Sequence, residues 1–88
     1  MKVTLGKAGL TETFQGEFPE TIKCVHCKGT ARIGFVAHEG GKGDDAPYVC
    51  HLHSNDPSGT GLWLHDCCCV AVYFCKQCLN PTALYNQG

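Results

Sequence analysis

The chain has 88 residues, eight of them cysteine, and a formal net charge of −1 from seven basic and eight acidic side chains. A chain this short buries a small core, so domains of this size usually add disulfides, a metal ion or a partner subunit. The basic residues are scattered, which gives no indication of generic nucleic-acid binding. No stretch approaches the length of a membrane span. We therefore expect one domain, residues 1–88, held together through its cysteines.

The first 18 residues indicate the compartment. They contain neither an apolar run of signal-peptide length nor a small-residue cleavage pattern. This favours a cytoplasmic, reducing environment, in which a cysteine-rich chain more often binds metal than forms disulfides.

The N-terminal third shows weak strand patterns. Residues 1–10 carry little pattern, and we expect a short strand or a frayed end. Residues 11–24 place apolar side chains on one face, but Gly16 and Pro19 interrupt that face. Because proline cannot donate to a ladder, the segment is typical of an irregular or edge strand.

A half-buried strand is predicted next, because apolar and other residues alternate from Thr30 to His38. We expect His38, beside the following glycine-rich loop, to be solvated. The alternation assigns Ala31, Ile33, Phe35 and Ala37 to one face and Arg32, Gly34, Val36 and His38 to the other.

The second half of the chain alternates loops and strands. Residues 40–47 and 54–61 are rich in glycine, proline and aspartate and are expected to be loops. Residues 48–53 read as a short strand, residues 62–75 as a long one and the tail 79–87 as a short final strand. No segment has a helical pattern. The predicted fold is therefore a small, mainly β protein of antiparallel hairpins with long loops.

Two Cys-x-x-Cys pairs, Cys24 with Cys27 and Cys75 with Cys78, predict a metal site. This spacing lets both thiolates of one tight turn face the same ion. Two such turns complete a tetrahedral four-sulfur site, which zinc accepts with bonds of about 2.3 Å. We expect one zinc ion per chain. Redox-active Cys-x-x-Cys pairs normally lie at the N-terminus of a helix, and no helical pattern follows either pair here.

The residues after each pair support this interpretation. Gly29 and Asn80 each lie two places after the second cysteine of a pair. Glycine and asparagine most readily adopt positive φ, which a turn that closes on itself requires. Strand-like segments flank both pairs, so each pair is predicted at the tip of a hairpin.

The chain resembles the zinc-ribbon and rubredoxin-like group of folds, and the residues that carry this resemblance are Cys24, Cys27, Cys75 and Cys78. The resemblance covers about residues 20–36 and 70–85 and implies two hairpin-tip knuckles around one metal ion. The long segment between the knuckles would be an elaboration of the sheet. Neither pair has the Cys-Pro-x-Cys-Gly form of rubredoxin, which argues against iron and electron transfer.

Three further cysteines, Cys67, Cys68 and Cys69, lie within the long predicted strand. Both faces of that strand are apolar, which predicts a central strand in which free cysteines pack as small hydrophobic residues. The alternation assigns Cys67, Cys69, Ala71, Tyr73 and Cys75 to one face and Cys68, Val70, Val72 and Phe74 to the other.

Two active roles are alternatives for the remaining cysteines and histidines. A second metal site would draw on Cys50, His51, His53, His65 and Cys67. No Cys-x-x-Cys turn organises that group, so buried cysteines and solvated histidines are favoured. A cysteine–histidine nucleophile from the same group would need an oxyanion hole and a substrate pocket, and the sequence indicates neither.

Function is therefore expected to lie in binding rather than in catalysis. A closed four-sulfur site leaves the metal no open coordination position, and the balanced charge favours a protein partner over nucleic acid. Trp63 would be a contact residue if it is exposed, although core packing is the commoner outcome. His26, within the first knuckle, is a second contact candidate. A thiol-redox or rubredoxin-like protein, a metal chaperone or sensor, and a homo-oligomer remain alternatives.

Overall fold

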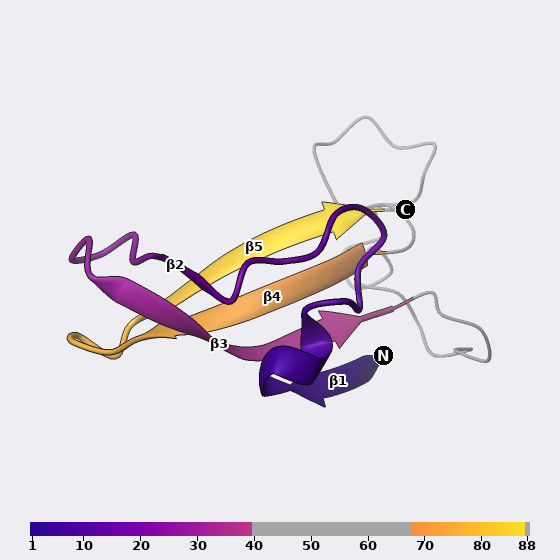
Figure 1. Ribbon diagram of the computed structural model, residues 1–88, viewed down its shortest axis with the longest axis horizontal. Helices are drawn as coiled ribbons and strands as arrows, with labels where there is room; N and C mark the ends of the chain where they lie inside the picture. The colour runs from indigo at the N-terminus through magenta and orange to yellow at the C-terminus, as the bar shows by residue number, and fades with distance from the viewer. Residues whose placement is uncertain (40–67, 88) are drawn as a thin grey trace, which may run out of the picture.

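The computed structural model of the chain describes residues 1–39 and 68–87, and these form a small antiparallel β fold (Figure 1). The predicted fold class is confirmed, and the described residues contain no α-helix. No helix in this part of the chain is long and apolar enough to cross a membrane. The elements in chain order are β1 (Lys2–Leu5), the 3-10 helix η1 (Gly6–Gly9), β2 (Thr21–Lys23), β3 (Thr30–His38), β4 (Cys68–Cys75) and β5 (Pro81–Gln87).

The strands form one sheet in the order β1–β3–β4–β5, with β2 also paired to β3. All pairings are antiparallel. β2 pairs with the first residues of β3 and β1 with its last four, so these two short strands share one side of β3. β4 lies between β3 and β5, as predicted for a strand that is apolar on both faces.

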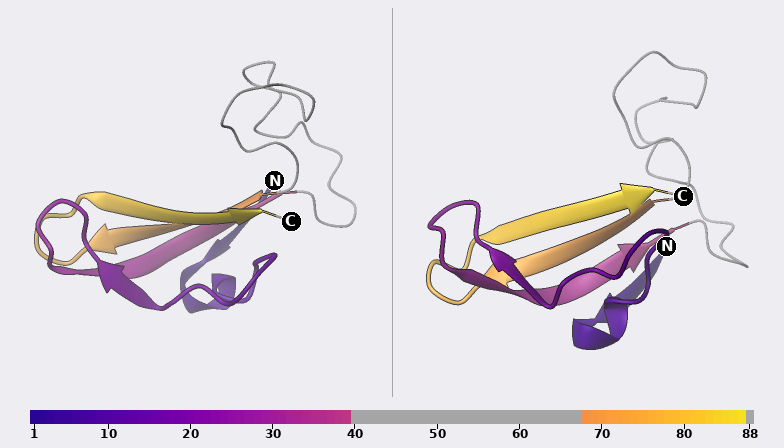
Figure 2. Two further views of the ribbon diagram at one scale, coloured as in Figure 1. Left: turned by 90° about the horizontal axis from the view of Figure 1, so that it is seen from above. Right: turned by 45° about the horizontal axis from the view of Figure 1, so that its top comes forward.

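One face of the sheet carries the core. Cys69, Ala71, Tyr73 and Cys75 of β4 are buried there, as their alternation predicted. The chain between η1 and β2 crosses this face and contributes the buried Phe18 (Figure 2). The Tyr73 hydroxyl donates a hydrogen bond of 2.6 Å to the Pro19 carbonyl, which ties this segment to the middle of the sheet.

A bulge in β3 overturns half of the alternation predicted for that strand. The register with β4 shifts between Ile33 and Phe35, so Gly34 is an extra residue. One extra residue sends every later side chain to the opposite face. Val36 is therefore fully buried in the core, whereas Phe35 and Ala37 lie half-buried on the other face.

The same shift accounts for the position of His38, which was expected to be solvated and is half-buried. The bulge turns His38 to the core face, where its ring stacks on Phe14 at a centroid distance of 4.5 Å. The side-chain amide of Asn86 in β5 holds this region in place. It donates to the Thr13 hydroxyl and accepts from the Phe14 amide.

Residues 2–9 form β1 and η1, so the N-terminal segment is ordered rather than frayed. η1 packs against β3 through Gly9, which is buried. The expected loops 40–47 and 54–61, the expected strand 48–53 and the beginning of the expected strand 62–75 lie outside the described residues and stay predictions.

The contact of η1 with β3 leaves no space for a side chain at position 9. A Cβ atom on Gly9 would lie 2.8 Å from the Val36 side chain and 3.0 Å from the Thr4 carbonyl oxygen. Because Val36 is fully buried, Gly9→Ala should lower the free energy of unfolding by about 1–3 kcal/mol. Urea unfolding measures this. Gly16→Ala is the control, since a Cβ there meets no atom within 4 Å and should change stability by about 0.5 kcal/mol at most. Equal losses in both variants would contradict this account of the contact.

Candidate metal centre

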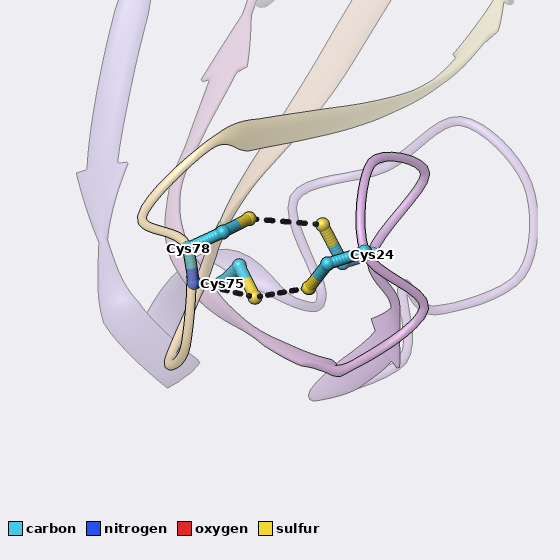
Figure 3. A group of neighbouring side chains, drawn as sticks. Cys24, Cys75 and Cys78 are labelled. Atoms are coloured by element: carbon cyan, nitrogen blue, oxygen red, sulfur yellow. Dashed lines mark hydrogen bonds between the residues drawn. The ribbon is translucent and has the colours of Figure 1, made fainter.

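The structure brings together the four cysteines that their spacing singled out. One knuckle, residues 24–27, lies in the turn between β2 and β3, and the other, residues 75–78, joins β4 to β5. Figure 3 shows Cys75 and Cys78 of the second knuckle facing Cys24 of the first. Both knuckles lie at the same end of the sheet, away from the chain termini (Figure 1).

The sulfur atoms are spaced as metal ligands are. Cys24 Sγ lies 3.7 Å from Cys78 Sγ, and Cys27 Sγ lies 3.4 Å from Cys75 Sγ. All four sulfurs lie within 4.8 Å of one another. A tetrahedral ion with bonds of about 2.3 Å would separate its sulfur ligands by about 3.8 Å. The group could therefore hold one metal ion with small adjustments.

Each knuckle is followed directly by one residue in the left-handed backbone region, but it is not the residue predicted. The positive φ angles belong to Lys28, at 68°, and Leu79, at 64°. The prediction of Gly29 and Asn80 was wrong by one place in both turns. The amides of Lys28 and Leu79 donate to the carbonyls of the first cysteines, Cys24 and Cys75, at 3.1 and 3.2 Å. That closure bends the chain back directly after the second cysteine.

Gly29 and Asn80 have other functions in the turns. Their carbonyls accept hydrogen bonds from the amides of Cys24 and Cys75, at 2.8 and 3.2 Å, which closes each hairpin. A Cβ atom on Gly29 would lie 2.2 Å from the Gln77 Oε1 atom of the opposite knuckle. The two knuckles therefore approach closely at Gly29, although a side chain there could be admitted by moving the exposed end of Gln77.

Backbone amides in the turns stabilise negative charge on two of the sulfurs. The amides of Cys27 and then His26 lower the pKa of Cys24, against the opposing effect of burial. The amides of Cys78 and then Gln77 lower the pKa of Cys75 to about 6. The first cysteine of each knuckle thus favours the thiolate, which is the form that binds metals.

For Cys27, the interactions that raise the thiol pKa outweigh those that lower it. The Gly29 amide lowers its pKa, but the adjacent thiols of Cys75 and Cys78 outweigh that effect and raise the pKa to about 11. Negative charge accumulates as the clustered thiols ionise, so further ionisation becomes unfavourable. A divalent cation among the sulfurs would reverse this, because it stabilises every coordinating thiolate.

Hydrogen bonds join each knuckle to the opposite half of the sheet. The Val25 amide donates to the buried hydroxyl of Thr82 in β5 at 3.2 Å. The Lys76 amide donates to the Thr30 carbonyl, where β3 begins, at 3.1 Å. Within the second turn, the side-chain amide of Asn80 also donates to Cys78 Sγ at 3.4 Å. The relative position of the two Cys-x-x-Cys turns is thus fixed by the protein itself.

The other predicted site residues divide into two groups. His26 lies exposed at the tip of the first knuckle. The remaining predicted site residues lie outside the described part of the chain and stay predictions: Cys50, His51, His53, Trp63, His65 and Cys67.

Cys68 and Cys69 are buried, as predicted, but they also form hydrogen bonds. The Cys68 thiol donates to Glu39 Oε1 at 2.8 Å, and the Glu39 amide donates to the Cys68 carbonyl at 2.9 Å. The Cys69 thiol donates to the side-chain oxygen of Asn86. Glu39 itself is almost fully buried. Its sequence position does not predict this, because an acidic residue that follows a strand normally points to solvent.

Comparisons with protein-family models, with curated proteins and with solved structures find no match for this chain. A four-cysteine cluster in a small antiparallel β fold is consistent with a zinc-ribbon-like site. The assignment of the site therefore depends on its own geometry.

The left-handed residue of the second knuckle gives a direct test of the turn. Leu79 is 76% exposed, so replacing it loses little burial. Leu79→Gly should raise the free energy of unfolding by about 0.5–1 kcal/mol, because glycine adopts positive φ without strain. Leu79→Val should lower it, because a β-branched residue tolerates this region least. Denaturant unfolding at a fixed metal concentration measures both. Changes of the same sign would show that the conformation at residue 79 does not control the stability of the turn.

Proposed function

We propose that this chain is a small zinc-binding domain in which Cys24, Cys27, Cys75 and Cys78 hold one structural zinc ion. The observation that carries the proposal is that four sulfurs from two separate turns lie within 4.8 Å of one another. Donated amides and left-handed closures support the turns in the same way on both sides. Zinc would supply folding free energy and would join the two hairpins at one end of the sheet.

The donor set favours a structural ion over a catalytic one. Four protein thiolates fill a tetrahedral shell, so no position remains for water or substrate. Zinc accepts this shell without a redox change. Iron accepts the same shell, so the identity of the metal is a matter for measurement.

The outer surface of the knuckles suits contact with another protein. Val25 is 61% exposed and Leu79 is 76% exposed, so an aliphatic side chain faces solvent within the first knuckle and directly after the second. Lys28 and Lys76 are exposed beside them. A protein surface that combines apolar and acidic side chains would match both features, through apolar burial and charge complementarity.

Metal content tests the first part of the proposal. Native mass spectrometry with elemental analysis should find one zinc per wild-type chain and none in Cys78→Ser. That variant should also lose its cooperative unfolding transition, because structural zinc sites contribute on the order of 10 kcal/mol to folding. Cys69→Ser is the matched control, since Cys69 is fully buried but lies outside the four-sulfur group. It should keep its zinc. Full zinc content in Cys78→Ser would overturn the site, and iron in the wild type would change its chemistry to electron transfer.

A surface variant tests the second part. Val25→Ser combined with Leu79→Ser should keep the zinc and the fold but lose most of the protein recovered by affinity capture with the wild-type chain. The large apolar contacts at the centre of an interface contribute most of its affinity. Leu5→Ser is the control, because Leu5 on β1 is also 76% exposed but belongs to neither knuckle. Equal capture by all three chains would place the contact surface elsewhere.

A further inference from the structure

Among the residues that the structure describes, β5 forms an open edge of the sheet. It is seven residues long, and within this part of the chain it pairs only with β4. In both views of Figure 2, no strand of the described residues lies beyond it. An edge of this kind presents a row of backbone donors and acceptors that another strand can pair with.

The sequence of β5 lacks most of the devices that protect edges. Proteins usually place charged residues, prolines or bulges on such strands. β5 has no charged residue and no register shift, and its only proline is the first residue, Pro81. It also exposes two large side chains, with Leu84 at 36% and Tyr85 at 63% exposure.

The hydrogen-bond pattern shows which backbone groups face outward. The Cys75 amide donates to the Asn80 carbonyl, so the amide of Cys75 points toward β5. Bonding alternates along an antiparallel pair, so the backbone of Thr82, Leu84 and Asn86 faces β4. The N–H and C=O groups of Ala83 and Tyr85 therefore face away from the sheet. The backbone of Pro81 also faces away from the sheet, so the lack of an N–H group at this residue removes no hydrogen bond to β4.

We propose that two copies of this chain pair through β5, antiparallel and about a two-fold axis at Leu84. In this register Ala83 of each copy lies opposite Tyr85 of the other. The outward N–H and C=O groups of each Ala83–Tyr85 pair then form two hydrogen bonds between the copies, and the two-fold axis generates a second such pair. The five-stranded sheet of each copy would continue into the sheet of its partner.

Side-chain sizes favour this register over its neighbours. Directly opposed residues lie about 4.5–5.5 Å apart between Cβ atoms. Leu84 would pack against Leu84 of the second copy, on the face that carries the core. On the other face, each Tyr85 would lie over the small Ala83 of the second copy. A shift of one residue in either direction would separate the two leucines.

Charge and surface composition favour a second copy over another partner. β5 contains no charged side chain, so pairing two copies of it brings no like charges together. The net charge of −1 also gives little repulsion between copies. The strand pairing within each chain places Phe35, Val72 and Ala83 in one row on the face of the sheet opposite the core. Tyr85 of the second copy would continue this apolar row, so pairing covers apolar surface on both faces of the edge.

Sedimentation equilibrium of the zinc-loaded chain in reductant tests the proposal. The wild type should show a reversible dimer whose fraction rises with concentration. Leu84→Lys places two like charges together at the axis and should raise the dimer dissociation constant at least about tenfold. Val3→Lys is the control, because Val3 is 56% exposed on β1, near the opposite side of the sheet. It should change the constant by no more than about twofold.

A second variant keeps the test independent of side-chain charge. Ala83→Pro removes one outward N–H group and leaves the β4 ladder intact, so the chain should keep its zinc and its circular dichroism. Its dissociation constant should also rise at least about tenfold. A monomer at every concentration would overturn the proposal. So would a dimer that survives both β5 substitutions, or one that Val3→Lys weakens equally.

Discussion

The pairing of β3 with β4 is the interaction on which the rest of the structure depends. It sets Ala31 opposite Cys75, and β3 begins three residues after Cys27. The register of this single pair therefore determines whether the two Cys-x-x-Cys turns meet. A slip of one residue would move the turns apart along the strands and turn the core side chains of β4 away from their partners. The same register therefore determines both the packing of the core and the positions of the four cysteines.

The apolar core and the sulfur cluster form one continuous interior. Cys24 and Cys75 belong to the same buried group as Ala31, Tyr73 and Phe18, and Cys78 packs against it. Much of that group is small, with alanine and cysteine at four of its central positions in β3 and β4. Small side chains bury little apolar area each. The core alone therefore contributes modestly to stability, which leaves a substantial part for hydrogen bonds around the knuckles and, under the proposed function, for a zinc ion.

Local patterns were enough to predict much of this fold. The alternation in β4 correctly placed Cys69, Ala71 and Tyr73 on the buried face, and the Cys-x-x-Cys spacing correctly placed both knuckles at hairpin turns. The bulge at Gly34 was not predictable, because it arises from the fit between β3 and β4 and not from β3 alone. The left-handed residues were predicted one place too late. They are Lys28 and Leu79, whose amides close the turns onto Cys24 and Cys75, and neither residue type indicates positive φ.

The connectivity of the sheet also determines the order in which it can assemble. β4 and β5 are joined by the short second knuckle, whereas β3 and β4 are separated by the whole segment 40–67. Closing a long loop costs more entropy and slows folding, so the β4–β5 hairpin is the element that forms most readily. Cys75 and Cys78 belong to it, and Cys75 is the cysteine whose pKa is about 6. The second knuckle can therefore form before its hairpin meets β3, whereas the four cysteines come together only when β3 and β4 pair.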